Sequence, residues 1–408
     1  MASMSDPPAL SCRHHFPALS PGAVPGLQVF ADNSSRAQMP ECTLQAVEQQ
    51  LRHHETHRGG QPEWDSPRAA AMVALRTNAR EVAAAFCGGL PAQIGFAANG
   101  TGTLAVLARA LFGTVLQPGD SIAITEADHE ANRAPWQALE RFGCRVIDVP
   151  LAADGTLDAA AWQAALAHRP KVAALCMVSN VTGVVLPFEA MAQQAQDVGC
   201  AVVLDAVQGP PHGWTGVMGP HVDAAIFSNC KLFSPHLGWW ALRAGLLERM
   251  QLRPAVGQHP ALEWGTQSHA ALAGFVATHG YFRALTPAGA MAPALAAIRQ
   301  HEGLLVQRFL ARLPPSLHGT LLAADSPHPR VPIFSIALAR PHWAAVREAF
   351  ESAGIDVRIG QFGCPATLRR LAPHTQATAL RASFVHYNTL ADVDAVCDVL
   401  HELRARLS

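Results

Sequence analysis

The chain has almost no net charge and no long hydrophobic run, and these two absences reduce the classes of partner that the protein is expected to have. The sequence contains 30 Lys and Arg residues and 31 Asp and Glu residues, which gives a formal net charge of −1. It has no cluster of basic residues of the kind that binds the phosphate backbone of a nucleic acid. No apolar run reaches about 18 residues without a charge or a turn former, and the N-terminus lacks the apolar core of a signal peptide. We therefore expect no nucleic-acid partner, no membrane partner and a cytoplasmic location.

The sequence also lacks a regular pattern of cysteine pairs. The nine cysteines are irregularly spaced, include no CxxC pair and are odd in number, so a disulfide framework is not expected. Most should be small buried hydrophobic residues in a reducing compartment, and we expect no metal site. With 408 residues and 50% hydrophobic content, the chain can nevertheless bury a large core.

Short β-rich runs alternate with helical segments through much of the chain. In order, these runs are “QIGF”, “SIAIT”, “CRVIDVPL”, “VAALCMVS”, “CAVVLDAV” and “AAIFS”. Such alternation predicts an α/β fold with a mostly parallel sheet flanked by helices. We assign residues 1–59 to an N-terminal segment at the active-site edge, 60–270 to a large α/β domain, and 271–408 to a linker helix and a small C-terminal α+β domain.

Two ionisable residues follow apolar runs, where open parallel sheets bind ligands. Asp205 ends the run “VVLD”, where a buried carboxylate needs a cation, and Lys231 follows “AAIFS” 26 residues later. Neighbouring strands could bring this acid and this amine to one site, and pyridoxal phosphate requires both groups, for its ring nitrogen and for its Schiff base. Taken singly, Lys231 could be a surface lysine and Asp205 a helix N-cap.

A third feature is the glycine-containing turn in “FAANGTGT”, between a predicted strand and a predicted helix. Such a turn presents backbone N–H groups and a hydroxyl to an anion. The sequence contains no G-x-x-x-x-G-K-[ST] motif here, so a nucleoside-triphosphate loop is not indicated. The conjunction of an anion-binding turn, a buried acid and a lysine after a strand favours a cofactor enzyme.

Together these motifs resemble the class V aminotransferases of the pyridoxal-phosphate superfamily, and within them the cysteine desulfurase-like proteins. The resemblance covers nearly the whole chain and is carried by “FADNSSRAQMP”, “EADHEANRAPW”, “SNVTGVVLP”, “LDAVQGPPH”, “SNCKLFSPHLG”, “EWGTQSHAALAG” and “LRASFVHYNT”. It implies the fold type I of these enzymes, pyridoxal 5'-phosphate as cofactor, and a homodimer with shared active sites.

The resemblance also implies roles for single residues. Lys231 would hold the cofactor as a Schiff base, Asp205 would pair with its ring nitrogen, and His129 would stack on its ring, although His129 alone could be a surface histidine. Arg381 would bind the substrate α-carboxylate with its planar fork. The other implied contacts are Asn180 and Gln208 near the phenolic oxygen, Gly100, Thr101 and Ser228 at the phosphate, Thr266 at the phosphate of the partner subunit, Asn180 also at the substrate, and Arg58 in a segment that lines the partner's site.

Two departures from the family pattern concern chemistry. The usual histidine before the lysine is Cys230 here. Persulfide-forming members carry an R-x-G-H-H-C loop, whereas this chain reads “RIGQFGCPA”, with Gly363 in the place of the cysteine and Cys364 one residue late. Because thiol attack needs closely aligned atoms, this shift makes Cys364 a doubtful nucleophile.

We therefore expect a lyase that eliminates a β-substituent from an amino acid, such as a cysteine conjugate, and yields pyruvate and ammonia. Three alternatives stay open: a true cysteine desulfurase with Cys364 as its catalytic nucleophile, an aminotransferase or epimerase, and a catalytically silent protein that binds the cofactor. The catalytically silent protein is disfavoured by the presence of all four predicted site residues, because binding of the cofactor alone does not require all of them. These residues are Lys231, Asp205, His129 and Arg381.

Overall fold

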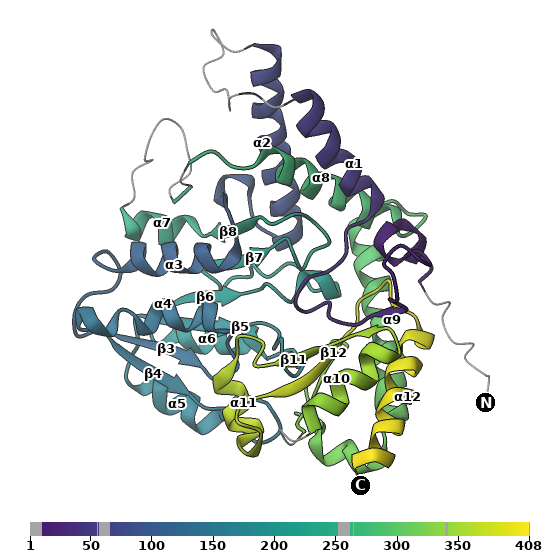
Figure 1. The fold of residues 1–408 in the computed structure, drawn as a ribbon. Helices are drawn as coiled ribbons and strands as arrows, with labels where there is room; N and C mark the ends of the chain where they lie inside the picture. The colour runs from purple at the N-terminus through teal and green to yellow at the C-terminus, as the bar shows by residue number, and fades with distance from the viewer. Residues whose placement is uncertain are drawn as a thin grey trace, which may run out of the picture.

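The computed structural model describes residues 10–54, 56, 66–251, 262–263, 265–338 and 342–407. Its centre is a seven-stranded sheet of strand order β2-β8-β7-β6-β5-β3-β4 (Figure 1). Strands β4, β3, β5, β6 and β7 run parallel, whereas β8 is antiparallel to both of its neighbours. The bounds are β2 Ile94–Ala97, β3 Ser121–Thr125, β4 Arg145–Val149, β5 Val172–Cys176, β6 Ala201–Asp205, β7 Ala224–Ser228 and β8 Gly238–Leu242.

The middle strands form because their residues suit burial on both faces. Every residue of β5 and β6 is buried, and both strands consist mainly of Val, Ala and Leu. A strand covered by helices on both sides is expected to be apolar throughout rather than alternating. The register pairs Cys176 with Asp205, and Asp205 with Ile226, so the acid sits at the carboxyl edge of the sheet.

Helices flank the sheet and connect its strands. Helix α2 shows how the sequence marks their ends: Ser66 Oγ accepts a hydrogen bond from the Ala69 N–H at 3.2 Å, and Gly88 ends the helix with a left-handed φ of 72°. The helices are α1 Glu41–Gln49, α2 Pro67–Cys87, α3 Gly100–Leu111, α4 Ala134–Gln137, α5 Ala159–Ala167, α6 Phe188–Asp197, α7 Ala244–Met250, α8 His269–Ala284, α9 Met291–Arg312, α10 Trp343–Ser352, α11 Pro365–Leu371 and α12 Leu390–Leu407.

A smaller antiparallel sheet of order β11-β12-β9 lies in the C-terminal part, beside α9, α10 and α12 (Figure 1). Its strands are β9 Ile333–Ile336, β11 Arg358–Gly360 and β12 Ala379–Ser383. The N-terminal segment joins this part, since β1 (Val29–Phe30) pairs in parallel with β10 (Ile355–Asp356). Residues just after β1 are thereby brought beside β12 and towards the carboxyl edge of the large sheet.

The predicted α/β class with a mostly parallel sheet is confirmed, with one strand of the seven-stranded sheet missed. β8 follows a segment rich in Ser, Pro and Gly, which is typical of a loop, and its own residues are not among the predicted β-rich runs. β8 pairs with both β7 and β2, and its two tryptophans, Trp239 and Trp240, suit a strand, so the turn-forming residues before it hid a local signal that was present. The domain bounds at residues 59 and 270 stay a prediction.

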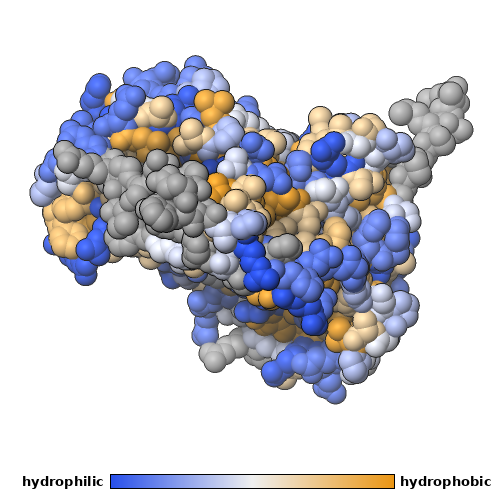
Figure 2. All heavy atoms as spheres, turned by 90° about the horizontal axis from the view of Figure 1, so that it is seen from above, coloured by the Kyte–Doolittle hydropathy of each residue, from blue (hydrophilic) through white to orange (hydrophobic). Residues whose placement is uncertain are grey.

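The surface seen from above mixes hydrophilic and hydrophobic residues (Figure 2). Within the residues that the structure describes, none of the helices combines the length and the apolar composition that crossing a bilayer requires.

Candidate active site

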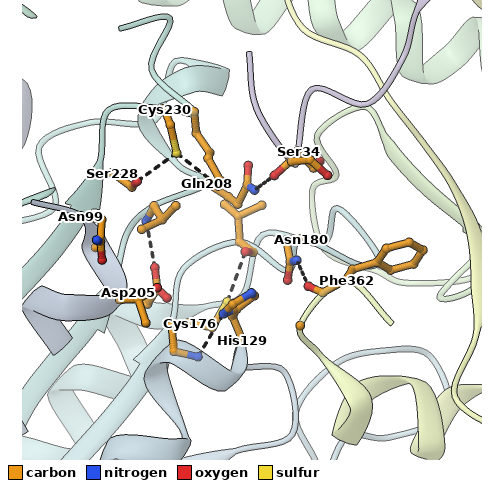
Figure 3. A pocket seen from close by; sticks show the side chains of 18 of the residues that line it. Ser34, Asn99, His129, Cys176, Asn180, Asp205, Gln208, Ser228, Cys230 and Phe362 are labelled. Carbon is orange, nitrogen blue, oxygen red and sulfur yellow. Dashed lines mark hydrogen bonds between the residues drawn. The ribbon is translucent and has the colours of Figure 1, made fainter. Parts of the chain in front are cut away.

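A cavity of about 760 Å³ opens at the carboxyl edge of the large sheet, and the small C-terminal sheet contributes to its wall (Figure 3). Sequence reasoning predicted many of its lining residues. Those brought together are Gly100, Thr101, His129, Asn180, Asp205, Gln208, Ser228, Lys231 and Arg381. They come from distant parts of the sequence, which makes the cavity the candidate active site.

Asp205 ends β6 and Lys231 follows β7 by three residues, so the paired strands bring the acid and the amine to the same cavity. Burial raises the pKa of Asp205 from 3.8 to about 6, while the Val207 N–H, 3.0 Å from Oδ1, and the positive charge of Lys231 act in the opposite direction. A buried carboxylate of this kind is suited to a cationic partner inside the cavity.

Cys230 lies directly beside the amine of Lys231. Its Sγ atom is 3.3 Å from Lys231 Nζ and 3.2 Å from Ser228 Oγ. Cys230 and Ser228 both line the cavity, so the residue that departs from the family pattern faces the site (Figure 3).

The first turn of α3 forms an anion-binding corner. The Asn99 side chain caps the helix by accepting a hydrogen bond from the Gly102 N–H at 2.8 Å, whereas the N–H groups of Gly100 and Thr101 have no acceptor within the helix. The turn also needs a glycine beside it, because a β-carbon on Gly238 of β8 would lie 2.2 Å from the backbone carbon of Asn99. The missed strand β8 therefore helps to position this corner.

His129 follows the carboxyl end of β3 and faces the cavity as a neutral imidazole. Its Nδ1 accepts a hydrogen bond from the Ala131 N–H at 3.0 Å, which leaves the proton of the neutral ring on Nε2. Burial, together with the charges of Lys231 and Arg381, lowers the pKa of His129 to about 4. A neutral ring is suited to stacking against a flat, electron-poor partner.

The neighbouring Asp128 fixes the turn that carries this histidine. Its carboxylate accepts hydrogen bonds from Thr125 Oγ1 at 2.6 Å and from Asn132 Nδ2 at 2.7 Å. Complete burial raises the pKa of Asp128 to about 7. Sequence reasoning did not single out this residue, because its role depends on contacts with a turn rather than with the cavity.

Arg381 reaches the cavity from β12 and is held by polar groups of the N-terminal segment. Its Nη2 donates to Asp32 Oδ1 at 3.0 Å and to Ser35 Oγ at 2.7 Å, and its Nη1 donates to the Asn180 carbonyl at 3.0 Å. Burial lowers the pKa of Arg381, and Asp32 partly offsets this effect. Asp32 and Ser35 stand in the quoted motif “FADNSS”, but without a three-dimensional contact nothing in the sequence assigned them to Arg381.

Cys364 is buried and is not among the residues that line the cavity. Its thiol donates to Asn180 Oδ1 at 2.8 Å, and burial raises its pKa well above the ordinary value of a thiol. Gly363 does line the cavity, but a β-carbon on it would lie 2.1 Å from His129 Nε2, and its φ is 69°. The imidazole thus occupies the space that a side chain at position 363 would need.

One further predicted residue, Thr266, lies apart from this cavity. Thr266 is exposed and does not line the cavity of its own chain. Arg58 lies outside the described residues. Their predicted roles involve a partner subunit and stay predictions.

Sequence reasoning also missed several lining residues, namely Ser34, Cys176, His236, Arg358, Gln361 and Phe362. Cys176 could have been found, because it lies in the predicted run “VAALCMVS”, and the structure ends this strand at Cys176 beside Asp205. The described part of the chain brings no group of three or more His, Cys, Asp or Glu residues together in a way that could hold a metal ion.

The residues present fit pyridoxal 5'-phosphate, the cofactor expected from the sequence. Asp205 supplies a buried acid for a protonated ring nitrogen, Lys231 supplies an amine, and the first turn of α3 supplies free N–H groups for a phosphate.

Comparisons with known proteins agree with this site. The family described as “Aminotransferase class-V” matches residues 29–396 of the chain. A Streptomyces coelicolor protein named “Probable cysteine desulfurase” is 30% identical over 416 residues, which cover 96% of this chain and 96% of that protein. A Vibrio cholerae protein with the same name is 29% identical over 404 residues, which cover 96% of this chain and 97% of that protein.

The fold is also similar to that of a solved structure. The apo structure of a cysteine desulfurase from Thermococcus onnurineus superposes with a TM-score of 0.83 at 22% identity, covering 99% of both chains.

Proposed function

The chain belongs to the class V aminotransferase family, and we propose that it is a pyridoxal-phosphate-dependent lyase that breaks a carbon–sulfur bond of an amino acid by β-elimination. It is a cysteine desulfurase-like enzyme. The observation that carries the choice of a lyase is the contrast between two groups: the Lys231 amine lines the cavity, whereas the Cys364 thiol is buried behind Asn180.

When bound, pyridoxal phosphate supplies an electrophilic aldehyde and a ring that accepts electrons from the substrate. Asp205 keeps a proton on the ring nitrogen, and its burial makes that pairing strong. His129 would offer its neutral ring to the cofactor ring, and the N–H groups of Gly100 and Thr101 would hold the phosphate. Ser228 and Gln208 supply further polar contacts from the cavity wall.

On the substrate, Arg381 orients the α-carboxylate and Lys231 removes the α-proton. The electron pair of the broken C–H bond forms the new carbon–carbon double bond, and the β-substituent leaves with the electrons of its own bond. Lys231 can return the proton that it carries to the leaving sulfur. Water converts the released unsaturated product to pyruvate and ammonia.

A second candidate is a cysteine desulfurase in the strict sense, because the relatives named above carry that name. It would transfer sulfur to Cys364 and release alanine. The direct hydrogen bond from Cys364 to Asn180 and its complete burial weigh against this route, since a thiolate nucleophile has to reach the substrate sulfur.

We further propose a homodimer in which Thr266 reaches the cofactor phosphate of the partner subunit. Thr266 is exposed outside the cavity of its own chain, which is the placement that such a role requires. The substrate is an amino acid, and the volume of the cavity leaves room for a cysteine conjugate.

The test is a product assay with L-cysteine and S-substituted cysteines, scored for pyruvate, alanine and sulfide. The proposed lyase forms pyruvate, and Lys231→Ala loses both turnover and the borohydride-fixed cofactor. Alanine as the main product from the wild type would overturn the proposal, and a borohydride-fixed cofactor in Lys231→Ala would show that another lysine holds it.

A further inference from the structure

The loop between β11 and α11 contacts Asn180 and Arg381, two cavity residues that the family resemblance places at the substrate. Phe362 O accepts a hydrogen bond from Asn180 Nδ2 at 2.9 Å, and the Cys364 thiol donates to Asn180 Oδ1 at 2.8 Å. The loop thus occupies both polar atoms of the Asn180 side chain. The guanidinium carbon of Arg381 also lies 4.5 Å from the ring centroid of Phe362.

Arg381 is 2% exposed, and most of its donors are in use. Its two Nη atoms donate to Asp32, Ser35 and the Asn180 carbonyl, whereas Nε is buried without a hydrogen-bond partner among the described residues. A buried donor on a cation is costly when it stays unpaired, so the Nε N–H is available to a ligand, together with the N–H of Nη1 that does not point to Asn180.

The backbone holds Phe362 in this place. Its φ is 55°, in the left-handed region that residues with a β-carbon rarely adopt. The next residue, Gly363, accepts a hydrogen bond from the Glu130 N–H at 2.7 Å, which ties the loop to the turn after β3. In Figure 3 the ring of Phe362 points away from Asp205 and His129, so it covers Arg381 rather than filling the centre of the cavity.

We propose that the Phe362 ring covers Arg381 and lowers the affinity of the site for its substrate, because it competes with the substrate α-carboxylate for the guanidinium. This inference rests on the proposed function, because it takes an amino acid as the ligand. A carboxylate makes charge-assisted hydrogen bonds with a guanidinium and displaces the ring, whereas the corresponding amine or amide cannot offer such bonds. A substrate that binds through Arg381 must therefore displace the ring, so the ring raises the KM for amino acids with a free α-carboxylate.

The test measures how fast phenylglyoxal modifies single arginines of the holoenzyme, with peptides mapped by mass spectrometry. Arg358, whose side chain is 59% exposed on the cavity wall, is the internal reference. The variants are Phe362→Ala and Phe362→Leu. The matched control is Phe142→Ala, because that ring also lies over a guanidinium, 4.6 Å from Arg141, at an exposed site.

In Phe362→Ala we expect modification of Arg381 to accelerate at least about 5-fold relative to Arg358, and the KM for the amino acid to fall by about 3- to 10-fold. Phe362→Leu should give intermediate values, since it keeps an apolar cover but lacks the aromatic ring. L-Alanine, which has the carboxylate but no leaving group, should protect Arg381 in Phe362→Ala. Phe142→Ala should match the wild type in each measurement.

An unchanged rate of Arg381 modification in both Phe362 variants, or an equal or higher KM, would overturn the proposal. The proposal about Phe362 and the proposed function can fail independently of each other. If the wild type turns over no amino acid, the proposed function fails, while the modification rates still decide whether the Phe362 ring covers Arg381.

Discussion

Replacing Asp205 with Asn should make the cofactor-free protein more stable and the enzyme inactive. The substitution keeps the size of the side chain and the oxygen that accepts the hydrogen bond from the Val207 N–H. It removes a negative charge that is buried at the end of β6. The same charge would hold the protonated ring nitrogen of the cofactor, so the stability gain and the functional loss have one cause.

The sign and size of the effect follow from the pKa of Asp205. Burial raises it from 3.8 to about 6 in the folded chain, so the native state holds this proton more tightly than the unfolded state does. Below about pH 4 the carboxyl group is protonated in both states, so Asp205 does not lower the free energy of unfolding. The lowering grows as the pH rises from about 4 through about 6. Since one pKa unit corresponds to about 1.4 kcal/mol, the ionised carboxylate should lower the free energy of unfolding by about 3 kcal/mol at pH 8.

The assay is urea unfolding of the cofactor-free wild type and Asp205→Asn between pH 4 and pH 8. The variant should gain stability over the wild type as the pH rises, with most of the gain between pH 4 and pH 7. Asp197→Asn, at an exposed position, should show no such gain. In the loaded enzyme, turnover by Asp205→Asn should fall by about 100-fold or more. A stability difference that does not change with pH would refute the assignment of a buried carboxylate with a raised pKa.

Two other substitutions test the geometry of the site. Gly363→Ala would place a β-carbon 2.1 Å from His129 Nε2 at a φ of 69°. The control is Gly113→Ala, where φ is 85° but no atom lies within 4 Å of the added carbon. Gly363→Ala should lower the free energy of unfolding by about 1–3 kcal/mol more than the control does, and equal losses would contradict the clash. If Thr266 serves the partner subunit, the protein should sediment as a dimer, and mixing Thr266→Val with Lys231→Ala should restore sites of wild-type cofactor affinity. A fully active monomer would exclude this arrangement.

Much of the fold could be predicted because its signals are local and agree with each other. The buried runs of β5 and β6 have the apolar composition of parallel strands, and α2 begins and ends at Ser66 and Gly88 as the capping rules require. β8 was missed although Trp239 and Trp240 suit a strand, because it directly follows turn-forming residues and no alternation of strand and helix leads to it.

The candidate site likewise contains some residues that the sequence could predict and others that it could not. Asp205 and Lys231 could be predicted, because the carboxyl ends of neighbouring parallel strands meet at one edge. The partners of Arg381 could not, because Asp32 is 349 residues away in sequence and comes close only through the N-terminal segment. Likewise, the contact between Phe362 and Arg381 needs a left-handed backbone that no sequence signal indicated.

The most direct test of the central claim is the fate of sulfur in the wild type and in Cys364→Ala. Both proteins would react with L-cysteine and with an S-substituted cysteine, and pyruvate, alanine and any enzyme-bound persulfide would be measured. Because the Cys364 thiol is buried against Asn180 and does not line the cavity, we predict equal pyruvate formation and no persulfide in either protein. Alanine together with a persulfide in the wild type, both lost in Cys364→Ala, would contradict the account and establish a cysteine desulfurase that uses Cys364.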